Sequence, residues 1–233
     1  MEIIKKKMIA FVLIGITIIS CNKEEIEPNI DVINERIHGK WIIEGVNEYS
    51  SIEFKKDGFS FVRKSEINVD PDFSTLGIYE IVENNIIYIA DFGALLVTRL
   101  TEDSISFTLE VTRNNAVYNL TAKKITPISN SEQTDLISKS WIIESINGQN
   151  SQFGIVMLTN AGTFYSYTQN AIENYGSWKW CNIEETKIAI TTNNSNLDCN
   201  GIQVIENIVL TPNSFSGIDK RNGTSDVLIM KNN

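Results

Sequence analysis

The chain is poor in the residues that most enzymes use for catalysis. It has one histidine, His38, and its thirteen glycines are scattered at turns. A single histidine excludes a histidine-based metal cluster, and no Gly-x-Ser-x-Gly stretch supplies a nucleophile for a triad through His38. No glycine-rich loop could cradle a phosphate. These absences predict a protein that is not an enzyme and that carries no metal or cofactor.

Basic residues are also scarce, with 20 Lys and Arg against 29 Asp and Glu. Removal of residues 1–20 would take away three lysines and one glutamate, leaving 17 basic and 28 acidic residues and a net charge of −11. An acidic surface without a basic cluster is repelled by phosphate backbones. We therefore expect no nucleic-acid partner.

Long apolar runs are absent except near the N-terminus, where Lys5-Lys6-Lys7 precedes an apolar run from Met8 to Ile19. That run is too short for a bilayer-spanning helix but fits a secretory signal peptide. The Ser20-Cys21 junction resembles the lipobox of bacterial lipoproteins. By that resemblance, residues 1–20 are a lipoprotein signal peptide and Cys21 carries the lipid. An ordinary signal peptide with an incidental cysteine is the alternative.

The residues after Cys21 are acidic and polar. Lys23, Glu24 and Glu25 resemble the surface-export signal of lipoproteins from Bacteroidota. Residues 21–35 have the composition of a tether. The resemblance implies a protein anchored to the outer membrane by lipid and exposed at the cell surface, with the membrane as a partner.

Once Cys21 is lipidated, two cysteines remain, Cys181 and Cys199. An even number in an exported protein favours a disulfide between them. Two buried free thiols are the alternative. A metal pair is disfavoured, because no histidine or further cysteine lies nearby in the sequence.

A tandem repeat organises the rest of the chain. Trp41-Ile42-Ile43-Glu44 recurs one hundred residues later as Trp141-Ile142-Ile143-Glu144. A match at a fixed offset indicates two copies of one structural unit. We place the first copy at residues 36–126, a linker at 127–135 and the second copy at 136–233.

Each copy alternates apolar and polar residues, with turn signals such as Asp57-Gly58 every eight to twelve residues. This pattern predicts about eight short antiparallel strands per copy and no competing helix. The expected fold is therefore all-β, with two tandem small antiparallel up-and-down barrels.

Gly39-Lys40-Trp41 on the first strand, the eight-stranded meander and a basic residue on the last strand resemble the lipocalin pattern. More closely, the layout resembles lipocalin-like domains of Bacteroidota lipoproteins. The resemblance implies that Lys124 packs over Trp41, and Lys231 over Trp141, to close one barrel end. The second copy departs from the pattern, because Lys139 stands where the glycine is expected.

Three aromatic residues of the second copy are candidates for ligand contact: Tyr175, Trp178 and Trp180. Trp178 and Trp180 alternate on one strand and so share a face. If exposed, they would form a stacking platform for sugars or peptides. We favour a core role, because Tyr79 and Ile81 hold the matching places in the first copy.

The inward positions of the first copy are expected to be large and to fill the barrel: Phe59, Phe61, Tyr88, Phe107, Leu109, Tyr118 and Leu120. A filled barrel binds ligands only at its mouth or in the groove between repeats. The sequence thus favours a non-catalytic recognition module for a protein or glycan. A carrier of a small apolar ligand is the alternative.

Overall fold

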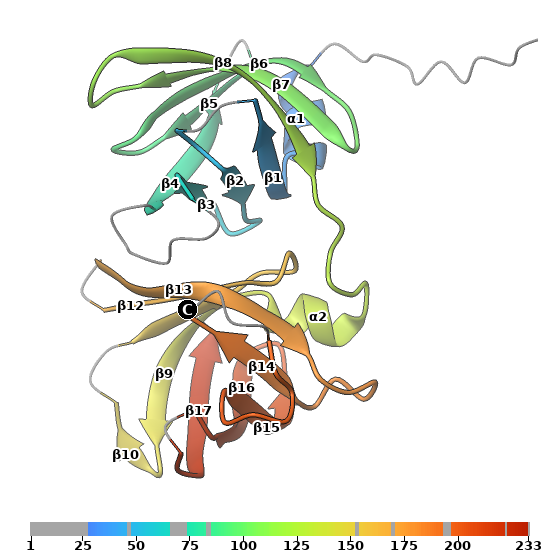
Figure 1. Cartoon of the computed structure of the whole chain (residues 1–233), viewed down its shortest axis with the longest axis vertical. Helices are drawn as coiled ribbons and strands as arrows, with labels where there is room; N and C mark the ends of the chain where they lie inside the picture. The colour runs from blue at the N-terminus through green and yellow to red at the C-terminus, as the bar shows by residue number, and fades with distance from the viewer. Residues whose placement is uncertain are drawn as a thin grey trace, which may run out of the picture.

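The computed structural model describes residues 28–45, 48–65, 74–82, 85–151, 154–168, 171–192, 197–221 and 223–232. It contains two closed antiparallel up-and-down barrels in tandem, one above the other in Figure 1. The predicted fold class is confirmed, and each copy forms its own barrel. The lipidation residue Cys21 and the export residues Lys23, Glu24 and Glu25 lie outside the described residues.

The first barrel closes in strict sequence order, with β8 returning to pair with β1. Every neighbouring pair is antiparallel, and the register places Trp41 beside Ile52 on one side and Lys124 on the other. Its strands are β1 (Gly39–Glu44), β2 (Ser51–Phe54), β3 (Phe59–Arg63), β4 (Ser74–Val82), β5 (Ile86–Ile89), β6 (Gly93–Leu100), β7 (Ser104–Val111) and β8 (Ala116–Lys124).

The second barrel repeats this order and closes through pairing of β17 with β9. A two-residue strand, β10, adds a short hairpin to β9. The strands are β9 (Ser140–Ile146), β10 (Gln149–Asn150), β11 (Ile155–Leu158), β12 (Thr163–Thr168), β13 (Ala171–Trp180), β14 (Ile188–Thr191), β15 (Val204–Leu210), β16 (Ser214–Asp219) and β17 (Asp226–Asn232).

A short helix precedes each barrel, which the sequence analysis did not predict. Helix α1 (Ile30–Arg36) begins in the segment assigned to the tether, and α2 (Glu132–Ile137) begins in the segment assigned to the linker. Asn29 and Ser131 cap the helices by accepting hydrogen bonds from first-turn amides. No helix of the described residues is long and apolar enough to cross a membrane.

Each helix is tied to the tryptophan of the following strand. The indole N–H of Trp41 donates to the Ile37 carbonyl at 2.7 Å, and that of Trp141 donates to the Ile137 carbonyl at 2.9 Å. Both indoles are buried, and a buried N–H without an acceptor would destabilise the fold. Each helix segment therefore covers one end of its barrel and supplies the acceptor for the N–H of the tryptophan that fills this end.

Lys124 packs over Trp41 as predicted, with its Nζ atom 5.0 Å from the ring centroid. The same Nζ donates to the Arg36 carbonyl at 2.7 Å. Gly39 makes this arrangement possible, because it has a φ of 117° and a Cβ at its position would lie 3.0 Å from the Lys124 stem.

The corresponding prediction for Lys231 is wrong. Lys231 pairs with Ile142 and is exposed, which makes it the counterpart of exposed Lys123. Strand alternation sends it to the outer face, and Asn232 holds the register position opposite Trp141. Lys139, in place of the glycine, instead donates to the Pro212 carbonyl at 2.9 Å.

The core of the first barrel confirms part of the predicted inward set. Phe107, Leu109 and Leu120 are buried inside, with Tyr118 packed against them. Tyr88 is 44% exposed, and its neighbours Ile87 and Ile89 point inward instead. Phe59 and Phe61 also point outward, because their register partners Ile78 and Leu76 face away from the core.

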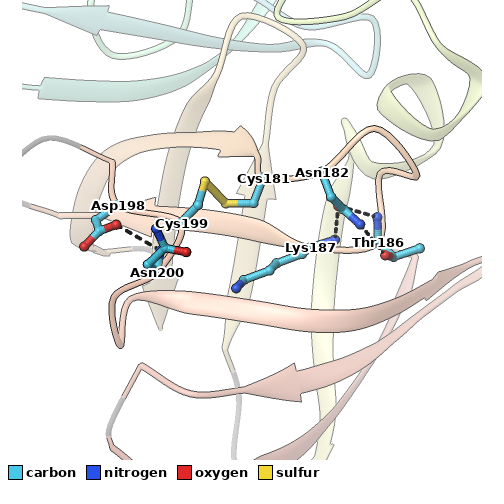
Figure 2. Close-up of a disulfide and its surroundings, with 7 residues drawn as sticks. All are labelled: Cys181, Asn182, Thr186, Lys187, Asp198, Cys199 and Asn200. Atoms are coloured by element: carbon cyan, nitrogen blue, oxygen red, sulfur yellow. Dashed lines mark hydrogen bonds between the residues drawn. A yellow bond between two sulfur atoms is a disulfide. The ribbon is translucent and has the colours of Figure 1, made fainter.

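The predicted disulfide joins Cys181 and Cys199, whose Cα atoms are 5.3 Å apart (Figure 2). It connects the end of β13 to the turn before β15, so it closes a loop that contains β14. The beginning of this loop is ordered by Asn182, whose side-chain oxygen accepts from the Thr186 and Lys187 amides (Figure 2). A disulfide that closes a loop of this size stabilises the fold by about 3 kcal/mol, because it reduces the conformational entropy of the unfolded chain.

The two lysines give a matched test of how the barrel end closes. Lys124→Ala should lower the free energy of unfolding by about 1–2 kcal/mol, because it removes the ring contact and the bond to the helix carbonyl. Lys231→Ala should change it by less than about 0.5 kcal/mol. Urea unfolding followed by tryptophan fluorescence measures both. Equal effects would contradict the assignment.

Candidate functional site

The outer faces of the two barrels meet along a joint that buries outward-facing residues of the strands. In β2 all four residues are buried: Ile52 and Phe54 fill the barrel, while Ser51 and Glu53 face outward. An outward residue is buried only if something covers it. In this chain the cover is the outer face of the second barrel, formed by β11, β12 and β13.

Aromatic rings form the apolar part of the joint. Phe61 stacks on Tyr165 and Tyr175 with centroid distances of 4.8 and 5.1 Å, and the Arg63 guanidinium lies 3.3 Å from the Tyr175 ring centroid. Met157 is fully buried in the same cluster. Ring pairs of this kind contribute about 0.5–1.5 kcal/mol each beyond their buried area. The joint thus resembles a small core between the barrels.

A polar bridge lies beside the rings. The buried Lys55 ammonium donates to the Ser140 hydroxyl at 2.9 Å and forms an ion pair with Asp57 at 2.9 Å. The Ser140 hydroxyl donates in turn to Asp57 at 3.1 Å. Burial lowers the pKa of Lys55, and the nearby Asp57 carboxylate opposes that shift. The bridge therefore connects the first strand of the second barrel to the β2–β3 turn of the first.

A groove of about 610 Å³ opens beside this bridge. Its volume is in the range of small-molecule sites. Both barrels contribute to its walls, and the lining residues are mainly polar or charged: His38, Gly39, Glu53, Phe54, Lys55, Lys56, Asp57, Phe59, Asp135, Ser138, Lys139, Ser140, Thr159, Asn160 and Asn232. The groove predicted between the repeats is therefore present.

Glu53 stands out among the lining residues. It is 2% exposed, and neither carboxylate oxygen has a hydrogen-bond partner in the described part of the chain. The Tyr165 hydroxyl, fully buried nearby, also has none there. Burial raises the pKa of Tyr165 well above its usual value, and the negative charge of Glu53 adds to the effect. Buried acceptors without donors are costly, so these two groups lower the stability of the joint.

His38 lies at the rim of the groove. Burial lowers the pKa of its imidazole, and the positive charges of Lys56 and Lys124 lower it further. His38 is therefore neutral at physiological pH, and it offers one N–H donor and one acceptor.

A second hollow of about 350 Å³ lies at the mouth of the second barrel. Apolar Phe164, Val156 and Ile190 line it together with polar Ser166, Asn174, Thr192 and Gln203. Arg221 also lines it and is held by Asp219, to which its Nε donates at 2.9 Å. The interior of this barrel is thus apolar near Trp141 and polar at the mouth.

The three aromatic candidates do not form an exposed platform. Trp178 is buried in the second core and donates to the Thr159 carbonyl at 2.9 Å. Trp180 packs against that core and donates to the Thr134 hydroxyl of α2 at 2.7 Å. Tyr175 points to the opposite face and is buried in the joint. The core interpretation is therefore confirmed for the tryptophans, and none of the three is available as a stacking surface.

Sequence reasoning missed the joint, although one signal for it was present. Ile155-Val156-Met157-Leu158 is apolar on both strand faces, a pattern of strands that are covered on both sides. Its counterpart in the first copy, Ser51 to Phe54, carries Ser51 and Glu53 at the outward positions, which is the pattern of a half-exposed strand. A charged residue facing a second barrel cannot be distinguished from a solvated one by alternation.

No group of three or more acidic, histidine or cysteine side chains suited to a metal ion occurs within the described residues. No protein-family model matches the chain, and no curated protein matches it in sequence.

The rim histidine gives a direct test of the groove electrostatics. His38 is unique, so its imidazole gives a single set of NMR signals in tag-free protein. Its pKa should lie below the usual value of about 6.5 and should rise in Lys56→Ala, which removes one of the two repelling charges. Exposed Lys179 on the second barrel gives the control, and Lys179→Ala should leave the pKa unchanged. If the pKa of His38 were the same in Lys56→Ala and in the wild type, Lys56 would not lie close to His38 as described.

Proposed function

We propose that this protein is a lipid-anchored cell-envelope lipoprotein that acts as a non-catalytic recognition module. Its recognition site is the groove between the two barrels. The observation that carries the proposal is the position of free volume: the larger of the two hollows lies between the barrels, whereas side chains fill the first barrel and leave only the smaller hollow at the mouth of the second. A protein built to enclose an apolar ligand needs the opposite distribution.

The filling of the first barrel supports this proposal. Trp41 and Lys124 close one end, and Tyr49 contacts Phe92 and Tyr118 edge to face toward the other, with centroid distances of 5.7 and 5.6 Å. Tyr49 is 6% exposed. Edge-to-face rings at such distances pack without space for a guest.

The alternative function, carriage of a small ligand, has its support in the second barrel alone. Its register positions equivalent to Phe107, Leu109 and Tyr118 hold Gly217, Asp219 and Asp226, which are smaller or charged. A ligand at this mouth would touch hydroxyl and amide groups above a floor of Phe164, so it would be polar rather than a fatty acid.

The anchoring part of the proposal rests on the N-terminal sequence. The apolar run, Ser20-Cys21 and the acidic Lys23-Glu24-Glu25 stretch follow one another in the order of a surface-exposed lipoprotein similar to those of Bacteroidota. Attachment through multiple acyl chains would hold the protein at the outer membrane without a spanning helix. The lipocalin-like layout of both barrels agrees with this family resemblance.

An apolar probe distinguishes recognition from carriage. The protein should bind 1-anilinonaphthalene-8-sulfonate weakly or not at all, because the cores are filled. The expected readout is a small, non-saturating fluorescence increase at micromolar protein. Saturable one-to-one binding per barrel would reverse the conclusion and restore the apolar carrier.

Metabolic labelling tests the anchor. An alkyne-tagged fatty acid supplied to cells that export the full chain should label the wild-type protein and leave Cys21→Ala unlabelled. Cys181→Ser together with Cys199→Ser keeps Cys21 and serves as the matched control, which should still be labelled. Label that persists on Cys21→Ala would exclude lipidation at this residue.

A further inference from the structure

We infer that the mouth of the second barrel binds a small neutral ligand that carries several hydroxyl groups, about the size of a monosaccharide, through Ser166, Asn174, Thr192 and Gln203. This hollow shares no lining residue with the groove between the barrels. The inference therefore goes beyond the proposed function and does not depend on it.

The first step is a comparison of the two barrels, which share strand order but differ in how this end is filled. Three apolar residues of the first barrel pack in its core, and polar residues hold their register positions in the second: Ser166 for Val62, Asp219 for Leu109 and Asp226 for Tyr118. The end beside Trp141 is filled in the second barrel too, so the hollow is confined to the opposite end. A barrel that served only as a scaffold would be more stable with this end filled as well.

The second step is access to the polar groups of the hollow. Asn174 and Gln203 are exposed, and Ser166 and Thr192 are half-buried. Asn174 donates to the Ser166 hydroxyl at 3.4 Å, a long hydrogen bond that a ligand hydroxyl can replace. A ligand that enters from solvent therefore meets four side chains that can bond to it.

The third step is the charge of the site. Arg221 is the one charged residue among the described residues that line the hollow. Its Nε donates to the two carboxylate oxygens of Asp219 at 2.9 and 3.1 Å, and its Nη2 donates to one of them at 2.6 Å. The pair carries no net charge, so an ionic ligand would lose hydration without gaining a counter-ion. A neutral ligand has no such penalty.

The fourth step is the type of neutral ligand. Hydroxyl and carboxamide groups both donate and accept hydrogen bonds, and so do the hydroxyls of a sugar or polyol, which can pair with these side chains in several orientations. The floor of Phe164, Val156 and Ile190 is almost fully buried, so it offers an apolar ligand little contact area. A volume of about 350 Å³ is at the lower end of the range for small-molecule sites, which suits a single sugar ring.

Titration followed by ¹H–¹⁵N NMR tests the inference on the protein with both barrels, residues 21–233. The probes are D-glucose, D-galactose and D-mannose, each also as its methyl α-glycoside, which mimics the terminal residue of a glycan. At least one sugar should shift amides around Ser166, Thr192 and Gln203 and saturate with a Kd of about 1–10 mM. The uronic acid and the amino sugar with the same ring should bind at least about tenfold more weakly, because each brings a charge into a neutral site. A methyl glycoside that binds as well as its free sugar would identify a glycan terminus as the source, and weaker binding would identify the free sugar.

The variants place the ligand within the barrel mouth. Ser166→Val gives the second barrel the residue that the first has at this position, and Gln203→Ala shortens an exposed side chain of the hollow. Each should weaken sugar binding about fivefold or more, and exposed Asn119→Ala on the outer face of β8 should leave it unchanged.

Three results would overturn the inference: unchanged sugar binding in Gln203→Ala, which decides the location even if Ser166→Val does not fold, tighter binding of a charged sugar, or no shift at the mouth up to about 50 mM sugar. Shifts confined to groove residues such as Lys55 and Ser140 would also overturn it, and they would leave the proposed function standing.

Discussion

The structure depends on the need to give each buried tryptophan N–H an acceptor at the closed end of a barrel. In an eight-stranded barrel the neighbouring backbone groups are already used in the ladder, so the acceptor has to come from outside the sheet. In both copies it is the carbonyl of the residue that follows or ends a short helix, Ile37 or Ile137. The helices are six or seven residues long and would not be stable alone. Their burial against the tryptophan stabilises them, and they in turn cover the barrel end.

The two copies differ at the closed end of the barrel, and they differ at two neighbouring positions together. Gly39 leaves room for the Lys124 stem, whereas the second copy has Lys139 and Asn232 at those two places. A Cβ at position 39 would lie 3.0 Å from the Lys124 stem, so the glycine and the last-strand lysine of the first barrel are sterically linked. Ser140, the residue after Lys139, faces outward and supplies the hydroxyl of the bridge to Lys55 and Asp57. The departure from the repeat pattern therefore lies directly beside the contact that joins the barrels.

The sequence was sufficient to predict the fold class, the two copies and the disulfide, because these follow from local alternation, a fixed offset and cysteine count. The Lys124–Trp41 contact was predicted from the resemblance to the lipocalin pattern. The sequence was insufficient to predict which face of β3 points into the barrel, and it did not predict the joint between the barrels. Alternation shows that Phe59 and Phe61 share a face, but either face of a strand is apolar when a second barrel covers it. The short helices lacked the length for a visible period, and only the capping residues Asn29 and Ser131 marked them. Alternation likewise gives no sign that Glu53 and Lys55 are buried, since their burial depends on residues from the other copy.

The joint explains why the groove has a defined shape. Stacked rings and the buried bridge hold the barrels in one relative arrangement, and a groove with walls on two bodies keeps its geometry only if those bodies do not move independently. A fixed groove binds with less loss of conformational entropy than one that has to be assembled on binding. The price is that charged groups are buried at the contact, including a carboxylate whose own chain supplies no donor within the described residues. If the contact between the barrels served stability alone, well-packed apolar residues at the positions of Glu53 and Lys55 would make it more stable. The presence of Glu53 and Lys55 at the wall of the groove agrees with the recognition role proposed above.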